Sequence, residues 1–537
     1  MSTPFSDDPV LTTSKVFDTP IPSLLKKNDQ FKHMLFVKQK RQFKHPLFAK
    51  LQQDYMGPLI LPSRIAAQQH GTLCMPAVLL ASGRQVQIRL RPLWFILLYL
   101  VCLVLNLLFM GKSILRPLNV YLTYAWASYL PIALIGIIGA IGSLRLKNPP
   151  FEGKVTQPVI FMIPTIARLD TVPALKRVVD SILLCAPQHL SSFTIHIITE
   201  EDAVGIPDLQ RVYRFHPQVT LIIVPAAYRT VNGTKYKSRA NQYALEYRHA
   251  YDLDRNDVFV YHGDDDTGIG PDTIWSIAHF LKEKSGRYDL AQGVLTYPHQ
   301  LCPSWFCKLA DSLRPADDLT RFLFFTGLLG RPLAGLHGEH LLVRASVEHT
   351  IGWDFGASVK VEDAYFGMYF SQRYPGRSTF LPSCSYGASP ATVSDLVKQR
   401  RRWAAGLFAL FFDRRISIPA KWSLCYATFN WVAGILQHVG VVLILSYFFN
   451  GFNTSPAFQV FIYVWCFNLA YFLWLYLEGL RMNLDASQAA RWTYFVLPWI
   501  VIMLMPAFSF VEAWAALLGL KDFLLKKKGF EVISKKI

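Results

Sequence analysis

Long apolar stretches recur along this chain. Five of them are about as long as a helix needs to cross roughly 30 Å of hydrocarbon. They lie at residues 92–110, 120–142, 424–449, 457–477 and 492–520. Any one of them could be the core helix of a soluble protein, but five together predict a membrane protein with several spanning helices.

The middle of the chain has a different pattern. Short apolar runs that read as buried strands alternate there with longer segments of helical spacing. The predicted strands are residues 158–164, 193–199, 219–225 and 257–261, and the predicted helices are residues 175–184 and 240–251. This alternation predicts a mostly parallel α/β sheet whose ligand site lies at the carboxyl ends of the strands.

Composition agrees with a membrane protein, because 52% of the residues are hydrophobic and only 17% are charged. The formal net charge of +18 could indicate nucleic-acid binding. The basic residues flank the apolar stretches, however, which favours contacts with membrane lipids and phosphate groups and no nucleic-acid partner. Residues 1–91 hold 13 Lys and Arg against 5 Asp and Glu. Since positive charge near span ends favours the cytoplasm, the N-terminal region and the middle segment are both predicted to be cytosolic.

Two acidic motifs are candidates for catalysis. Asp264, Asp265 and Asp266 follow the fourth predicted strand. Adjacent carboxylates repel one another unless a cation or solvent relieves them, and the outer pair of an extended D-x-D suits Mg²⁺ with a bound phosphate. A solvated surface turn is the alternative. Glu362 and Asp363 begin a helical pattern, where acids are also common as plain helix caps.

Two basic motifs accompany them. Lys237 and Arg239 precede a predicted helix, and cations beside helix-start amides suit a diphosphate. The second motif is Q-R-R-R-W at residues 399–403, shortly before an apolar run. Each motif alone could be a solvated face or a basic anchor at a membrane edge.

The order of these motifs closely resembles that of the membrane-embedded, inverting family-2 glycosyltransferases, which include the cellulose, chitin and hyaluronan synthases. The resemblance covers roughly residues 155–410 and rests on D-x-D, then E-D, then Q-x-x-R-W. Within that family, H-G-E-H-L-L-V-R at 337–344 and I-G-W-D-F-G at 351–356 look similar to egghead-type β-mannosyltransferases and their bacterial relatives.

The resemblance implies a cytosolic GT-A α/β catalytic domain inserted between transmembrane helices, with amphipathic interface helices. It implies that Asp264 and Asp266 hold Mg²⁺ or Mn²⁺ and that Asp363, beside Glu362, is the catalytic base. The implied nucleotide and diphosphate contacts are Asp202, Lys237, Arg239, Asp264, Asp266, Gln399 and Arg402, and the implied acceptor contact is Trp403. The family's first-strand signature, P-T-Y-N-E, is absent from residues 164–168, so the donor could be linked to UDP or GDP.

The predicted function is inverting transfer of a sugar from a nucleotide-diphosphate donor to form a β-glycosidic bond at the plasma (inner) membrane. Synthesis and translocation of a polysaccharide is the first interpretation. Transfer of one sugar, for example mannose, to a lipid-linked acceptor is the second, and a non-catalytic membrane subunit or transporter is the third. The product would therefore be a growing glycan or a glycolipid.

The predicted organisation follows the charge and apolar pattern. It comprises a cytosolic region at 1–91, two transmembrane helices at 92–142, the catalytic domain at 151–410, transmembrane helices at 421–520 and a basic cytosolic tail at 521–537. Three simple C-terminal crossings would leave that tail outside, so the last stretch is predicted to break near Pro506. Residues 530–535 partly match a gating segment, F-x-V-T-x-K, of the synthases.

Overall fold

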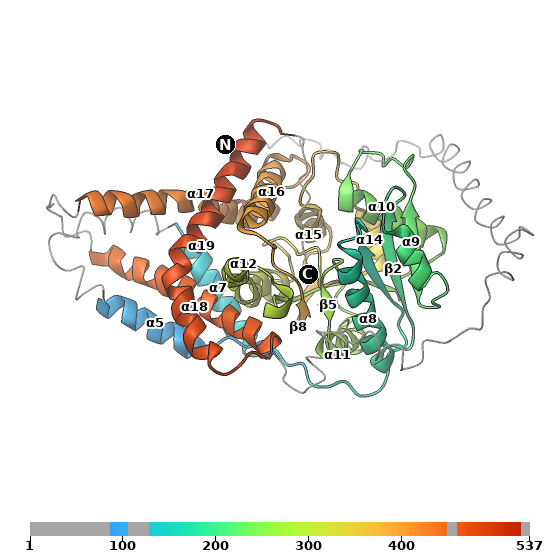
Figure 1. Cartoon of the computed structure of the whole chain (residues 1–537), viewed down its shortest axis with the longest axis horizontal. Helices are drawn as coiled ribbons and strands as arrows, with labels where there is room; N and C mark the ends of the chain where they lie inside the picture. Colours follow the sequence, from blue (N-terminus) through green and yellow to red (C-terminus); the bar gives the residue numbers. More distant parts are fainter. Residues whose placement is uncertain (1–85, 106–127, 448–458, 528–537) are drawn as a thin grey trace, which may run out of the picture. The chain divides into compact units, whose positions relative to one another are not determined.

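The computed structural model describes residues 86–105, 128–447 and 459–527. Its centre is an eight-stranded sheet with the order β3-β2-β1-β4-β7-β6-β8-β5 (Figure 1). The first half is parallel and consists of β1 (Val159–Pro164), β2 (Phe193–Glu200), β3 (Val219–Val224) and β4 (Phe259–His262). These are the four strands that the sequence predicts. They read as continuous apolar runs because a parallel sheet is covered on both faces.

The second half of the sheet makes it mixed. β7 (Leu341–Arg344) is antiparallel to both β4 and β6 (Leu290–Thr296), while β8 (Ser378–Tyr386) is parallel to β6 and antiparallel to β5 (Gly268–Ile269). The sequence analysis did not predict these four strands. One of them, β5, is only two residues long, which is too short for a periodic signal.

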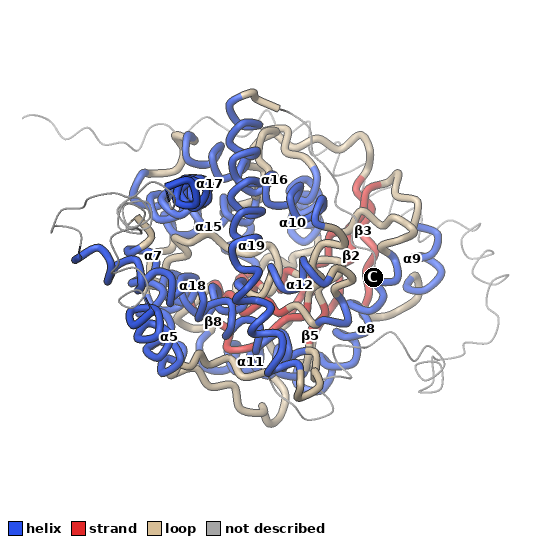
Figure 2. The backbone as a smooth tube through the Cα atoms, turned by 60° about the vertical axis from the view of Figure 1, so that its left-hand side comes forward, coloured by secondary structure: helices blue, strands red, loops and turns tan. Residues whose placement is uncertain are grey.

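Helices cover both faces of the sheet, and the strands lie between them in Figure 2. One face packs on α8 (Val172–His189), α9 (Ile206–Tyr213) and α11 (Pro271–His279). The other packs on α10 (Tyr236–Ala250), α14 (Ala345–Ile351) and α15 (Glu362–Arg373). The result is an α/β fold of the GT-A-like kind, with its parallel strands ending at one edge.

η3 (Phe280–Lys284) continues α11 beside the sheet. Further helices lie between the sheet strands and a group of apolar helices, namely η4 (His299–Leu301), α12 (Trp305–Ala310), α13 (Leu313–Asp317), η5 (Asp318–Leu328) and the longer α16 (Val393–Phe412). The apolar helices are α5 (Pro92–Leu105), α7 (Leu130–Ser143), α17 (Ile418–Tyr447), α18 (Gln459–Ala486) and α19 (Thr493–Leu524). Each overlaps one of the five apolar stretches found in the sequence.

Judged by length and composition alone, α19 is the one helix among the described residues that could cross a membrane. α5 and α7 are apolar but shorter than a span requires. The arrangement of five crossing stretches therefore stays a prediction.

The predicted break near Pro506 is wrong, because α19 is one continuous helix of 32 residues that contains Pro498 and Pro506. A proline removes one backbone hydrogen bond from a helix, and packing can offset that loss. Here Val501, Met505 and Phe508 are buried against residues of α12, α16 and α18. The predicted gating segment and most of the basic tail lie outside the described residues.

Candidate active site

The site is built where the parallel strands end. Thr165, directly after β1, donates a hydrogen bond of 2.7 Å from Oγ1 to Asp265 in the loop after β4. Glu200, the last residue of β2, forms an ion pair with Arg239 on α10. Carboxyl ends of neighbouring parallel strands meet at the same edge, so these loops converge there as expected.

Three carboxylates gather at this edge. Asp264, Asp266 and Glu339 each place an oxygen within 4.8 Å of the other two. Asp266 is almost fully buried, and Glu339 accepts a short hydrogen bond from Thr267. Their oxygens are the hard ligands that Mg²⁺ and Mn²⁺ prefer. The residues present therefore fit the predicted metal site.

Glu339 is a site residue that the sequence analysis missed. It precedes β7, and the antiparallel pairing places Leu341 at the start of β7 beside His262 at the end of β4. The first residue of β7 is thus next to the last residue of β4, where the D-D-D loop begins. The sequence shows this acid in the H-G-E-H motif, but only the order of the strands in the sheet places Glu339 beside Asp264 and Asp266.

Lys237 lies among the acids. Its Nζ forms a short ion pair with Asp264 and donates a hydrogen bond of 3.0 Å to the carbonyl oxygen of Gly338. Burial lowers the pKa of the Lys237 ammonium, but the carboxylates of Asp264, Glu362 and Asp363 together raise it above the ordinary value. The ammonium therefore stays charged, as a diphosphate contact requires.

Glu362 and Asp363 form the first turn of α15, beside Lys237. Burial and, next, the charge of Asp363 raise the pKa of Glu362 to about 7. Burial also raises the pKa of Asp363, against the opposing effect of Lys237. The pair therefore takes up a proton at a higher pH than ordinary carboxyl groups, which suits proton transfer near neutrality.

The Q-R-R-R-W run lies on α16, and its members have different surroundings. Burial lowers the pKa of Arg402, while Glu362, Asp264 and Asp363 act to raise it, so this guanidinium faces the acid cluster. The Gln399 side chain is buried and accepts a hydrogen bond from Arg400.

Trp403 is enclosed by cations. The guanidinium carbon of Arg314 lies 5.0 Å from the centroid of the Trp403 ring, and that of Arg400 lies 4.4 Å away. Arg400 also pairs with Asp311 and Glu512, with a distance of 2.7 Å to the latter. The tryptophan thus holds two arginines in place on the wall of the cavity.

Asp202 and Arg239 lie further out. Asp202 is exposed in the loop after β2 and lines the mouth of the cavity. Arg239 pairs with Glu200 and donates a hydrogen bond of 2.7 Å to the carbonyl oxygen of Pro225. Its guanidinium is therefore engaged within the protein and braces the loop after β3.

One cavity of about 1000 Å³ connects these groups. It is lined by nine of the ten predicted site residues, while Asp266 is buried beneath its surface. The cavity continues between the apolar helices, where Tyr129, Trp431, Tyr471 and Phe472 line it. His337, a residue that the sequence analysis also missed, faces this space and lies 2.6 Å from Asp318.

The part of the chain that carries these motifs is similar to known proteins. Residues 259–520 match the family model described as glycosyl transferase family group 2. This segment of the chain is similar to family-2 glycosyltransferases. The match covers the D-D-D loop, the E-D turn and Q-R-R-R-W, and β-1,4-mannosyltransferases are among the homologues.

The curated relatives include β-1,4-mannosyltransferase egh of Drosophila melanogaster, 26% identical over 355 residues that cover 66% of this chain and 73% of the relative. β-1,4-mannosyltransferase bre-3 of Caenorhabditis briggsae is 28% identical over 260 residues, 48% of this chain. The match spans 54% of bre-3, about half its length.

Among solved structures, a mannosyltransferase from Pyrobaculum calidifontis in complex with GDP-Man and Mn²⁺ is similar at 12% identity, with a TM-score of 0.39. That comparison covers 77% of this chain and 99% of the other.

Proposed function

We propose that this protein is an inverting β-glycosyltransferase that takes a sugar, mannose first among the candidates, from a nucleotide-diphosphate donor. The observation that carries the proposal is one cavity that brings together a carboxylate cluster, Lys237, Arg402 and the Glu362–Asp363 pair. The β-1,4-mannosyltransferase relatives support the choice of sugar.

In the proposed reaction, Asp363 removes the proton from an acceptor hydroxyl as that oxygen forms a bond to the anomeric carbon. The bond from that carbon to the diphosphate oxygen breaks on the opposite face, and the electron pair leaves with the nucleotide. One displacement inverts the anomeric centre, so an α-linked donor gives a β-linked product. The charge of Asp363 in turn raises the proton affinity of the neighbouring Glu362.

Charge on the departing diphosphate needs counter-charge. Lys237 and Arg402 supply two cations at the edge of the acid cluster, and such fixed charges stabilise a transition state more than a ground state. Asp264, Asp266 and Glu339 would hold Mg²⁺ or Mn²⁺ there. When bound, that ion would neutralise the diphosphate as a Lewis acid.

The cavity wall favours an acceptor with an apolar part. Beyond the acids it is lined by aromatic and aliphatic side chains of α17 and α18, among them Trp431, Phe472 and Leu475. Transfer of a single sugar to a lipid-linked acceptor is therefore the first candidate. Synthesis and translocation of a polysaccharide is the second, and the continuation of the cavity between α7, α17 and α18 favours it.

The test is incubation of the purified full-length chain with GDP-mannose, UDP-glucose or UDP-N-acetylglucosamine and Mn²⁺, with membrane lipid extract as acceptor. Product size distinguishes single addition from polymer, and the one-bond C1–H1 coupling constant in the NMR spectrum, which is larger for an α- than for a β-mannoside, reports the anomeric configuration. Asp363→Asn is the matched inactive variant. An α-linked product, or equal turnover by Asp363→Asn, would refute the mechanism.

We also propose that the protein is embedded in a membrane with α19 lying along the surface instead of crossing it. The start of α19 is held by Tyr494, whose hydroxyl donates a 2.8 Å hydrogen bond to Asp485 at the end of α18. That end of α18 is itself bound to the catalytic segment, since Asn483 accepts a 2.8 Å hydrogen bond from the Tyr297 amide.

The far end of α19 meets the catalytic segment again. Asp522 pairs with Arg401 of α16 at 2.8 Å, and Lys360 donates a 3.2 Å hydrogen bond to the carbonyl oxygen of Lys527. A crossing helix would separate its ends by the full hydrocarbon thickness, roughly 30 Å. With both ends on one segment, α19 fits the interface plane.

The outer face of α19 suits that position. It exposes one stripe of large apolar side chains, namely Trp492, Phe495, Val496, Trp499, Met503, Phe510 and Trp514. At 100° per residue these positions fall on a single side of the helix. Tryptophan side chains are enriched where a protein meets the headgroup region, and three of them, Trp492, Trp499 and Trp514, lie on this stripe. The basic tail then stays on the catalytic side of the plasma (inner) membrane, as its charge requires.

A further inference from the structure

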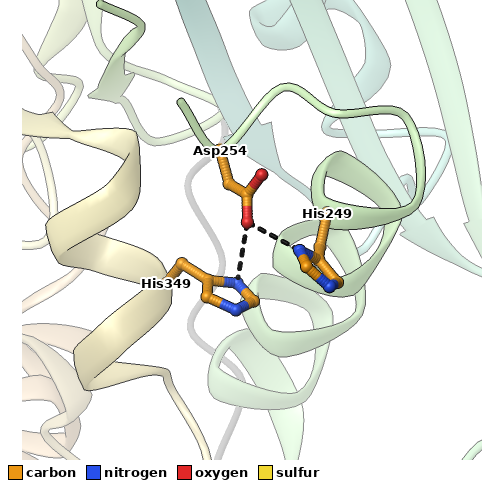
Figure 3. Close-up of side chains that lie close together, drawn as sticks. All are labelled: His249, Asp254 and His349. Carbon is orange, nitrogen blue, oxygen red and sulfur yellow. Dashed lines mark hydrogen bonds and ion pairs between the residues drawn. The ribbon is translucent and has the colours of Figure 1, made fainter. Parts of the chain in front are cut away.

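A second cluster of metal-ligating side chains lies away from the proposed active site. His249 is in the last turn of α10, Asp254 is in the loop that follows, and His349 is in the last turn of α14 (Figure 3). One ligand atom from each of the three lies within 4.8 Å of the other two. None of these residues lines the large cavity.

The two imidazoles face one carboxylate. His249 Nδ1 is 2.7 Å and His349 Nδ1 is 3.4 Å from the same oxygen of Asp254. The two rings are stacked, with centroids 4.5 Å apart and planes at 27°. Figure 3 shows both Nδ1 atoms directed at the carboxylate.

We propose that His249, Asp254 and His349 form a binding site for a first-row transition-metal ion such as Zn²⁺, separate from the carboxylate site for Mg²⁺ or Mn²⁺. Tetrahedral zinc, with bonds of about 2.0–2.1 Å, sets its ligand atoms about 3.3 Å apart, so the observed spacings need small adjustments. Imidazole nitrogen with one carboxylate is a ligand set for zinc, nickel or copper rather than for magnesium.

The electrostatics of the site favour a cation. The cluster lies at the carboxyl-terminal ends of α10 and α14, where the helix dipole places partial negative charge.

The ion would link α10 to α14, and both helices contribute side chains to a buried network of ion pairs and hydrogen bonds. Next to His249, Arg248 pairs with Glu348 at 2.7 Å, and Glu348 precedes His349. Glu348 also accepts a 2.7 Å hydrogen bond from Trp353 and lies 3.2 Å from His262, the last residue of β4. The site would therefore tie α10 to α14 behind the strand that leads into the D-D-D loop.

The test uses the untagged full-length chain in detergent, titrated with Co²⁺ as a spectroscopic substitute for Zn²⁺. Excess Mg²⁺ is present throughout to occupy the carboxylate site. We expect one Co²⁺ per chain with visible d–d absorption, its displacement by Zn²⁺, and a rise in the unfolding temperature on binding. His249→Ala and His349→Ala should each abolish the absorption band, while His216→Ala, on another surface, should retain it.

Two outcomes would overturn the proposal. One is the absence of any d–d band from the unaltered chain, and the other is an equal band in both cluster variants. Each variant's unfolding temperature without added metal shows whether it is folded, and Asp254→Asn provides a third variant of nearly equal volume. Glycosyl transfer is not the readout, so failure of this site and failure of the proposed function remain distinguishable.

Discussion

At the scale of single residues, the neighbouring carboxyl groups of Glu362 and Asp363 in the first turn of α15 determine how the site takes up protons. Because burial raises the pKa of Glu362 to about 7 and also raises that of Asp363, the pair gains a proton as the pH falls through this range. A protonated Asp363 cannot act as a base. Transfer should therefore decline toward acid, with an apparent pKa near that of the pair.

The pH profile of kcat/KM for sugar transfer checks this. Glu362→Gln removes the group of the pair whose pKa is raised to about 7, so the acid limb that remains, that of Asp363, should lie at lower pH. An unchanged acid limb in this variant would mean that the two carboxyl groups do not interact in the enzyme.

Trp403 was expected to contact the acceptor, and the structure places two guanidinium groups against its ring. Trp403→Ala should release Arg314, whose cation–π contact contributes about 0.5–2 kcal/mol. We expect roughly a 2- to 30-fold rise in the acceptor KM, with nucleotide affinity nearly unchanged and Trp403→Phe close to normal. Weaker nucleotide binding in place of weaker acceptor binding would assign Trp403 to the donor side.

Gly338 is a residue where space is limited. A Cβ added there would lie 2.8 Å from Lys237 Nζ and 3.4 Å from Asp363 Oδ2. Gly338→Ala should push the lysine off Asp264 without unfolding the chain, because the end of a lysine side chain can move. We expect reduced turnover with an unchanged unfolding temperature. Gly286→Ala, which meets no atom within 4 Å, is the control.

At the scale of elements, α16 and α19 are joined by buried ion pairs. Arg400 is almost fully buried between Asp311 and Glu512, so Arg400→Met leaves two carboxylates without their cation. Removing one partner of a buried ion pair costs about 3–5 kcal/mol of unfolding free energy. The adjacent Arg401 is more exposed, and Arg401→Met should cost about 1 kcal/mol or less.

Chemical or thermal unfolding of the detergent-solubilised protein measures both changes. Equal losses for the two variants would contradict the assignment of Arg400 as the main electrostatic link between these helices. The result also concerns the Q-R-R-R-W motif at residues 399–403. From the sequence, this motif could be either a basic anchor at a membrane edge or a part of the active site. In the structure, Arg400 and Arg401 brace α19 and Arg402 faces the acids.

The parallel strands and the apolar helices could be predicted because each is long enough to show a continuous apolar run. β5 could not, since it contains only two residues. β7 has four residues, as β4 has, but its antiparallel place between β4 and β6 depends on neighbours far away in the chain. Most residues of the candidate site could be predicted from the order of the D-x-D, E-D and Q-x-x-R-W motifs. Glu339 and His337 did not, because their approach to the aspartates depends on the antiparallel insertion of β7, which local sequence does not encode.

At the scale of the whole molecule, the position of α19 decides on which side of the membrane the chain ends. If α19 lies in the interface, a cysteine introduced in place of Lys526 should stay unlabelled by a membrane-impermeant maleimide in intact cells. It should become labelled after the cells are opened. Labelling in intact cells would make α19 a crossing helix. The labelling obtained after the cells are opened is the positive control.

The glycines between the apolar helices and the catalytic segment have a mechanical consequence. An added Cβ at Gly139 would lie 1.9 Å from the Thr320 carbonyl oxygen, and one at Gly479 would lie 1.7 Å from that of Ser312. Backbones in such contact leave no clearance for sliding. The catalytic segment should therefore tilt and shift together with α7 and α18, as one stiff piece. Any opening that admits the donor must come from loops at the rim, and a thinner or thicker bilayer would change the depth of the site instead of its geometry.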